Sequence, residues 1–129
     1  SPLRIVLDPQ GRIPKESNVL LDEFDTLIFS TKKSATTKEV VISDFKKPLE
    51  HLCVLLHQKN IQSLIVEGGS KTLQGFIDSG LWDEARIFTS PKVLNEGIKK
   101  PILKGKQKSS NLIEGDMLEI ILPNPEKER

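Results

Sequence analysis

The residues best suited to chemistry are an acid, a glycine pair and a polar triplet that follow one another near the middle of the chain. Glu67 is followed directly by Gly68 and Gly69, and then by Ser70-Lys71-Thr72. If a helix begins here, its first backbone N–H groups have no intrahelical partner and carry partial positive charge. Glycines let a phosphate approach the backbone closely, while the hydroxyls and the ammonium add donors. The segment therefore predicts an anion-binding turn with a carboxylate beside it.

A strand and a helix must position this turn. Ser63–Val66 is a short apolar run, typical of a buried strand. Between Leu73 and Ile77 the apolar residues recur at helical spacing, and Gly80 stands where a helix usually ends. Glu67 would lie at the carboxyl end of the strand, where open α/β sheets bind their ligands. A tight strand-to-helix connection without a ligand has the same pattern, so the glycine pair does not by itself distinguish the two.

A second candidate follows the first apolar run of the chain. Leu3–Leu7 is typical of an interior strand, and it ends at the turn sequence Asp8-Pro9-Gln10-Gly11. A carboxylate at a strand end is able to accept a hydrogen bond from a ribose hydroxyl, which makes Asp8 a candidate cofactor residue. The more common alternative is an aspartate that caps its own turn.

The sequence lacks the usual sets of catalytic nucleophiles and metal ligands. It has no Ser/His/Asp or Cys/His arrangement, no H-E-x-x-H, no C-x-x-C and no Walker loop. His51 and His57 have no partner at ligand spacing, and Cys53 lies on an apolar helical face, so we expect neither a metal site nor a thiol nucleophile. A hydride-transfer enzyme would show the same absence, because there a nicotinamide carries the reaction and the protein supplies position and electrostatics.

Composition favours one globular domain. The chain has 129 residues, of which 36% are hydrophobic and 29% charged, with a formal net charge of +1. The balanced charge gives no indication of nucleic-acid binding, and no apolar run approaches the roughly 20 residues that span a bilayer. A single cysteine fits a reducing compartment. We therefore expect a cytoplasmic protein that binds neither nucleic acid nor membrane.

Strand and helix patterns along the chain predict an α/β fold, a three-layer α/β/α sandwich around a mostly parallel sheet. The clearest helix begins at Pro48, and its apolar residues share one face. Residues 99–110 are rich in lysine and are expected to form a solvent-facing connection. The expected strands are Leu3–Leu7, Thr26–Phe29, Glu39–Ile42, Ser63–Val66, Ala85–Thr89 and Met117–Leu122, and the expected helices are Pro48–Gln58 and Lys71–Ser79.

Two segments of the chain resemble a known family. The first segment resembles the core motif of the reductase domain of riboflavin biosynthesis. It comprises Leu64–Gly69, Thr72-Leu73 and Gly75-Phe76, and it continues through Gly80–Glu84 and Ser90–Lys92. Pro2–Asp8 and Gly11–Pro14 look like the family's middle strand and the turn after it. This domain is the C-terminal half of the bifunctional pyrimidine deaminase/reductase. It has a dihydrofolate-reductase-like fold whose last strands tend to run antiparallel, which implies a mixed sheet.

The resemblance implies NADPH-dependent reduction of 5-amino-6-(5-phosphoribosylamino)uracil to the ribitylamino product, by a protein that associates as a homodimer. Glu67 would contact the phosphorylated pyrimidine substrate near the reacting ribose, and no residue of the chain is implied as a catalytic nucleophile or metal ligand. The residues implied for the cofactor are Gly68, Gly69, Ser70, Lys71, Thr72, Leu73, Gln74 and Gly75 in the central turn, with Asp8 and Pro9.

Two further details concern the implied cofactor site. The family position after Asp8 touches the cofactor, but here it is Pro9, which has no N–H to donate. Ser30-Thr31-Lys32-Lys33-Ser34 follows an expected strand and is a candidate for the 2′-phosphate of NADPH. A solvated surface loop is the alternative for this cluster.

The resemblance also implies that residues 1–129 are one N-terminally truncated reductase domain, because the family's domain has a further strand and loops before this point. On that ground we expect the chain by itself to be inactive. Two other functions stay open. The chain could belong to the related reductases that act on the 2,5-diamino pyrimidine, or it could serve as a non-catalytic scaffold that associates through an exposed sheet edge.

Overall fold

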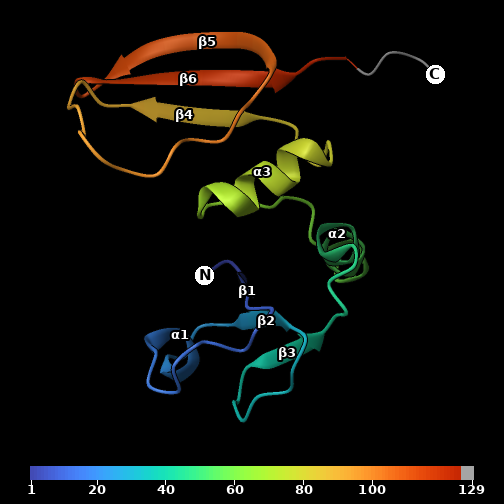
Figure 1. Cartoon of the computed structure of the whole chain (residues 1–129). Coiled ribbons are helices and arrows are strands. Elements are labelled where there is room, and N and C mark those ends of the chain that lie inside the picture. The colour runs from blue at the N-terminus through green and yellow to red at the C-terminus, as the bar shows by residue number, and fades with distance from the viewer. Residues whose placement is uncertain (126–129) are drawn as a thin grey trace. The chain divides into compact units, whose positions relative to one another are not determined.

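A computed structural model of the chain describes residues 1–125, and these fall into two compact units, residues 1–64 and residues 65–125 (Figure 1). The N-terminal unit holds three strands and two helices. The C-terminal unit holds one helix and three strands. None of the helices in the described range is long and apolar enough to cross a membrane.

A parallel sheet organises the N-terminal unit. Its strands are β1 (Arg4–Leu7), β2 (Thr26–Ser30) and β3 (Glu39–Ile42), in the order β1-β2-β3. The register brings Val6, Ile28 and Val40 side by side. Every residue of β2 is buried, as expected for a central parallel strand that is apolar on both faces.

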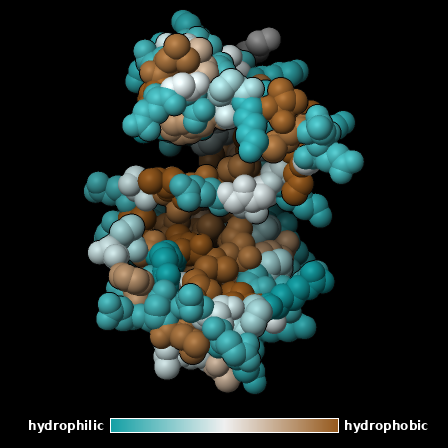
Figure 2. Space-filling model, turned by 90° about the vertical axis from the view of Figure 1, so that its left-hand side faces the viewer, coloured by the Kyte–Doolittle hydropathy of each residue, from teal (hydrophilic) through white to brown (hydrophobic). Residues whose placement is uncertain are grey.

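Helix α2 (Pro48–Gln58) completes the core of this unit. It begins with proline at the first helical position and buries Leu52 and Leu56. Phe29 of β2 lies with its ring centroid 5.0 Å from the ring of His51. A short helix α1 (Asn18–Leu21) precedes β2. Figure 2 shows hydrophobic side chains gathered on one face of the lower part of the view, where the N-terminal unit lies. This unit therefore does not bury all of its apolar surface within itself.

The C-terminal unit contains α3 (Ser70–Asp78) and an antiparallel sheet. The strands are β4 (Ala85–Thr89), β5 (Gly105–Ile113) and β6 (Asp116–Pro123), in the order β4-β6-β5. A two-residue turn joins β5 to β6, with φ of +49° at Glu114 and +89° at Gly115. Positive φ at both turn residues matches the right-handed twist of a hairpin.

Most expected elements are confirmed, several with shifted ends. Strands Glu39–Ile42 and Ala85–Thr89 and helix Pro48–Gln58 have the expected bounds. The strand expected at Ser63–Val66 is wrong: the described structure gives it no strand partner, and Ile65 is 84% exposed. An apolar, β-prone sequence favours an extended backbone, but a strand also requires a neighbouring ladder.

The connection expected over residues 99–110 is also partly wrong, because β5 begins at Gly105 within it. This strand has little apolar alternation and remains exposed along most of its length. Its pairing depends on β6 and on the tight turn between them, neither of which shows in the local pattern. As a result the described strands form one parallel and one antiparallel sheet, and not a mostly parallel set.

Candidate functional site

The glycine turn at the start of α3 has the geometry of an anion site. Gly68 has a φ of +154°, which side-chain-bearing residues rarely adopt, and Gly69 is the N-cap with φ −65° and ψ 158°. A Cβ built on Gly69 meets no heavy atom within 4 Å, so the space in front of the helix is open. Because glycine has no side chain, a ligand can reach the backbone here.

Four backbone donors point out of this helix start. The first intrahelical hydrogen bond that α3 closes runs from Leu73 N–H to Gly69 C=O, at 3.3 Å. The N–H groups from Gly69 to Thr72 have no backbone partner within residues 1–125. From Leu73 onward, including Gly75, the N–H groups are used inside the helix. The backbone donors available to a phosphate are therefore those of Gly69–Thr72.

The remaining residues of the central motif differ in exposure. Glu67, Lys71 and both glycines are exposed, and Glu67 makes no hydrogen bond to any described residue. Leu73 is half-buried and precedes the buried Phe76. Gln74 is occupied by bonds to Ile102 and Asp78, at distances of 2.8 to 3.1 Å. Glu67 and the first helical turn are thus open to a ligand, whereas Leu73 and Gln74 are engaged by the protein.

Asp8 stands after β1 and caps its own turn. Its Oδ1 accepts the N–H of Arg12 at 2.9 Å, and its Oδ2 accepts the N–H of Ile13 at 3.2 Å. The turn-capping interpretation therefore describes the contacts that are present. Each carboxylate oxygen retains a second lone pair, so a ribose hydroxyl could still donate to Asp8.

The two candidate segments of the N-terminal unit lie side by side. The hydroxyl of Thr31 donates to the carbonyl of Pro9 at 2.5 Å, and the stem of Lys32 passes Gly11, where a built Cβ would lie 3.7 Å from Lys32 Cδ. Ser30 Oγ accepts the N–H of Lys32 at 3.2 Å. Since β1 and β2 are parallel, their carboxyl ends share one edge, and the hydroxyl and lysine cluster follows that edge.

Comparison with known proteins agrees with these features. The sequence model of the RibD C-terminal domain matches residues 1–120. The chain belongs to this family.

Named relatives of this RibD C-terminal domain include both kinds of riboflavin reductase. It is 32% identical over 106 residues to the riboflavin biosynthesis protein RibD of Aquifex aeolicus, covering 75% of this chain and 29% of that protein. It is 33% identical over 100 residues to the 2,5-diamino-6-ribosylamino-4(3H)-pyrimidinone 5′-phosphate reductase of Archaeoglobus fulgidus, covering 70% of this chain and 46% of that protein. The chain therefore spans less than half of the length of each.

Solved structures confirm the fold. The deaminase/5-amino-6-(5-phosphoribosylamino)uracil reductase of Thermotoga maritima matches with a TM-score of 0.81 at 23% identity, over 95% of this chain and 38% of that one. The riboflavin biosynthesis reductase Rib7 of Saccharomyces cerevisiae matches with a TM-score of 0.72 at 16% identity, over 95% of this chain and 69% of that one. The expected α/β, dihydrofolate-reductase-like fold is thus confirmed, although its described strands lie in two separate sheets and not in one mixed sheet.

Sequence reasoning missed Ser43 and the role of His51 in the RibD C-terminal domain. Ser43 follows β3 and is 4% exposed, and its Oγ lies 3.2 Å from His51 Nδ1 and accepts the N–H of Phe45 at the same distance. Phe45 has a φ of +56°. These contacts lie at the carboxyl end of β3, the third strand of the parallel sheet. In the sequence, a single serine after a strand and a histidine outside the apolar face of a helix do not indicate that the two residues pair.

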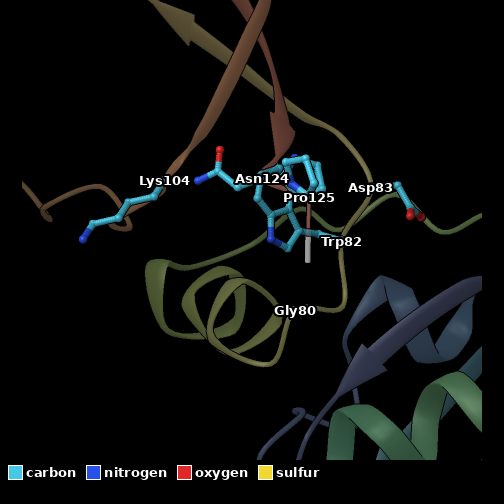
Figure 3. Close-up of a pocket in the computed structure, with 7 residues that line it drawn as sticks. Gly80, Trp82, Asp83, Lys104, Asn124 and Pro125 are labelled. Carbon is cyan, nitrogen blue, oxygen red and sulfur yellow. The ribbon is translucent and has the colours of Figure 1, made fainter. Parts of the chain in front are cut away.

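The depression beside Trp82 is separate from the glycine turn of the domain. It measures about 510 Å³, and Figure 3 shows the indole of Trp82 next to Asn124 and Pro125, with Lys104 and Asp83 extending outward. Trp82 thus lies beside the residues that follow β6. A second depression of about 340 Å³ is lined by His57, Asn60, Ile61 and Gln62.

Side chains that could serve other chemistry are dispersed. Across residues 1–125, no three His, Cys, Asp or Glu side chains are grouped so that they could hold a metal ion. Cys53 has no disulfide partner, and burial raises the pKa of its thiol. A raised pKa leaves less of the reactive thiolate at neutral pH. Cys53 is a half-buried residue of α2.

Proposed function

We propose that this chain is part of an NADPH-dependent reductase of riboflavin biosynthesis that converts 5-amino-6-(5-phosphoribosylamino)uracil to its ribitylamino product. The observation that carries the proposal is a family match over residues 1–120 together with an open glycine turn at the start of α3. A relative from Buchnera aphidicola, 27% identical over 106 residues, is named 5-amino-6-(5-phosphoribosylamino)uracil reductase.

Each unit by itself carries groups that suit a phosphorylated ligand. In the C-terminal unit, the N–H groups of Gly69–Thr72 and the side chain of Lys71 would hold the pyrophosphate. In the N-terminal unit, Asp8 would accept from a ribose hydroxyl, and the Ser30–Ser34 cluster would bind the 2′-phosphate. Pro9 would contribute van der Waals contact or a second lone pair of its carbonyl, which already accepts one hydrogen bond from Thr31.

Bound NADPH supplies the hydride of this reaction, so the chain itself requires no nucleophile. The ribosyl C1′ accepts the hydride, its bond to the ring oxygen breaks, and that oxygen takes up a proton. Glu67 is exposed and has no competing hydrogen bond in the described structure, so it is available to a ribose hydroxyl of the substrate. The protein's role is to bind and orient the substrate.

The alternative substrate is the 2,5-diamino pyrimidinone phosphate, which is reduced at the same ribosyl carbon. The 33% identity to the Archaeoglobus fulgidus enzyme supports this alternative. Parallel assays with the amino-uracil and the diamino-pyrimidinone substrates distinguish them, because the two differ only at the pyrimidine ring.

We further propose that the enzyme is a cytoplasmic homodimer. The single free cysteine supports a reducing compartment, and β5 is an edge strand whose outer backbone groups are available for pairing. Light scattering at several protein concentrations tests this, and a mass equal to one chain at all of them would contradict the dimer.

The deciding experiment is a calorimetric titration with NADPH, with NADH for comparison, on the chain alone and within the longer gene product where the gene encodes one. We expect NADPH-selective binding in at least one form. Glu67→Ala should leave NADPH affinity within about twofold of the wild type, because Glu67 faces the substrate, while turnover falls at least about tenfold. Absence of NADPH binding in both folded forms would overturn the proposal.

A further inference from the structure

The side chain of Gln74 fastens the loop between β4 and β5 to helix α3. Its Oε1 accepts the backbone N–H of Ile102 at 2.8 Å, and its Nε2 donates to the backbone carbonyl of the same residue at 3.1 Å. The second hydrogen of Nε2 is directed to Asp78 Oδ1, at 2.9 Å, one helical turn further on. The carboxamide therefore pairs with Ile102 much as a neighbouring strand would, and Asp78 fixes its orientation.

This clasp is the principal attachment of the loop. Residues 90–104 have no regular secondary structure, and the apolar side chains of Val93, Ile98 and Ile102 are 81%, 88% and 74% exposed. Within residues 1–125, every hydrogen bond that ties this loop to another element comes from Gln74. Residues 90–100 are all exposed, whereas Pro101 and Leu103 on either side of Ile102 are half-buried, so some packing adds to these hydrogen bonds at the clasp.

The loop that Gln74 clasps carries positive charge. Lys99, Lys100 and Lys104 flank Ile102, with Glu96 as the one acid of the loop. Gln74 is four residues from Ser70, which is about 6 Å along the helix axis. The clasp therefore joins the loop to α3 about one turn from the start of the helix. Lysines held here add attraction for phosphates at the open N–H groups of the helix.

We propose that Gln74 is a positioning residue that holds a basic loop beside the phosphate-binding turn, and that this loop strengthens binding of the anionic ligands of the enzyme. The proposal rests on the reductase function proposed above. It gives Gln74 a task different from the direct cofactor contact expected from the sequence. The carboxamide already donates both of its hydrogens, so a phosphate could bind it only by displacing Ile102 or Asp78.

The test compares Gln74→Leu and Gln74→Glu with the control Gln58→Leu. Leucine keeps the volume and helix propensity of glutamine but makes no hydrogen bond. Glutamate keeps the acceptor for Ile102 N–H, loses both donors and faces Asp78. Gln58 is an exposed glutamine at the end of α2 that makes no side-chain hydrogen bond in the described structure. Two measurements are made on each: the rate of tryptic cleavage after Lys99 and Lys104, and the Kd for NADPH at low and high salt.

We expect Gln74→Leu to accelerate cleavage in the loop at least about tenfold, because the clasp no longer opposes local opening. We expect its Kd for NADPH to rise about threefold to tenfold at low salt, and the difference to shrink at high salt. Gln74→Glu should fall between wild type and Gln74→Leu, and Gln58→Leu should match wild type. Melting temperatures of all variants identify any loss of global stability.

Unchanged cleavage in Gln74→Leu would overturn the clasp itself. Accelerated cleavage with unchanged NADPH affinity, or an affinity loss that salt does not reduce, would overturn the role of the basic loop while leaving the reductase function in place. If the wild type binds no NADPH, the reductase function fails and the ligand-binding role of the loop fails with it, whereas the cleavage measurement still decides the clasp.

Discussion

The hydroxyl of Thr31 donates a 2.5 Å hydrogen bond to the carbonyl of Pro9, and this bond joins the loops that follow β1 and β2. The two residues are far apart in the sequence, but their strands are parallel neighbours, so both loops leave the same edge of the sheet. Asp8 is adjacent in sequence to Pro9, and Lys32 is adjacent to Thr31. A cofactor that contacts one loop at this edge would therefore meet the other.

Thr31→Val keeps the shape of the side chain and removes this hydrogen bond. We expect a loss of about 0.5–1 kcal/mol in the free energy of unfolding, at the low end for a hydrogen bond because Thr31 is exposed. NADPH affinity should fall by more than the stability loss suggests, since the two loops would no longer be held together. Urea denaturation and calorimetry measure the two effects. Thr31→Ser retains the hydroxyl and should behave like the wild type, and equal affinity in both variants would contradict the linkage.

Gly68 and Gly69 are expected to respond differently to alanine. Gly68→Ala places a Cβ at a φ of +154°, which costs about 1–3 kcal/mol of stability. Gly69→Ala has an ordinary φ of −65° and meets no atom within 4 Å, so its folding stability should change by less than about 1 kcal/mol. Its methyl group, however, fills the space in front of the helix start. Thermal denaturation should single out Gly68→Ala, while NADPH titration should show that Gly69→Ala binds at least about tenfold more weakly.

A Gly69→Ala variant with wild-type affinity would show that the phosphate does not approach this backbone. That result would remove the main structural support for the cofactor turn. Lys71→Ala serves as a comparison at the same helix start, because it removes charge without adding volume near the backbone.

The sequence allowed prediction of elements whose own residues determine them. Helix Pro48–Gln58 was predictable because its apolar residues share one face and proline suits its first position. The start of α3 was predictable within one residue from the glycine pair. Strand β5 was not, since its stability depends on partner β6, and its own residues do not alternate. The same reasoning explains the error at Ser63–Val66, whose extended backbone lacks a neighbouring strand.

The candidate site shows the same division. Local motifs indicated the glycine turn, Asp8 and the lysine cluster, because each requires particular residue types in a row. The contacts of Gln74 with Ile102, and of His51 with Ser43, join residues from separate elements. Only the folded chain brings these pairs together, so no single-sequence pattern could indicate them.

Asp22 is the centre of an ionic cluster at the amino ends of the parallel strands, and its removal should destabilise the N-terminal unit. Both of its oxygens accept from the Arg4 guanidinium, and Lys38 Nζ lies 3.4 Å from Oδ1. The hydrogen bond from Arg4 is the main cause that lowers the pKa of Asp22 below its usual value near 3.8. Because the pKa of Asp22 is lower in the folded state than in the unfolded state, its charge stabilises the fold at pH values above the unfolded-state pKa. This stabilisation is lost as the pH falls through the folded-state pKa.

Asp22→Asn should therefore be less stable than wild type by a constant amount from pH 6 to pH 8, and the difference should narrow below about pH 4. Chemical denaturation across this pH range measures it. The control is Glu39→Gln, which breaks the exposed pair with Lys59 and should cost less at every pH. A difference between Asp22→Asn and wild type that widens at low pH would contradict the assignment.

Gly105 allows β5 and β6 to approach closely. A Cβ built on it would overlap the backbone oxygen of Leu122 and lie 2.7 Å from Ile121 Cγ2. Gly105→Ala should separate the strands locally and cost about 1–3 kcal/mol of stability. Gly97→Ala is the matched control, because a Cβ there meets nothing within 4 Å. Denaturation combined with amide hydrogen exchange should show the loss in the β5–β6 hairpin, and equal stability of the two variants would contradict the close approach.

Lys32 should determine the preference for NADPH over NADH. It follows β2 at the edge that carries Asp8 and Pro9, and its ammonium makes no ion pair with any described residue. If it binds the 2′-phosphate, Lys32→Ala loses a charge-assisted hydrogen bond of about 1.5 kcal/mol, which corresponds to roughly a tenfold rise in the Kd for NADPH. The Kd for NADH should stay unchanged, because NADH lacks that phosphate. Lys59→Ala, at the end of α2 and paired with Glu39 at the start of β3, should alter neither. Equal losses for NADPH and NADH in Lys32→Ala would show that this lysine acts on the shared part of the two cofactors, and the 2′-phosphate would then have to be bound elsewhere.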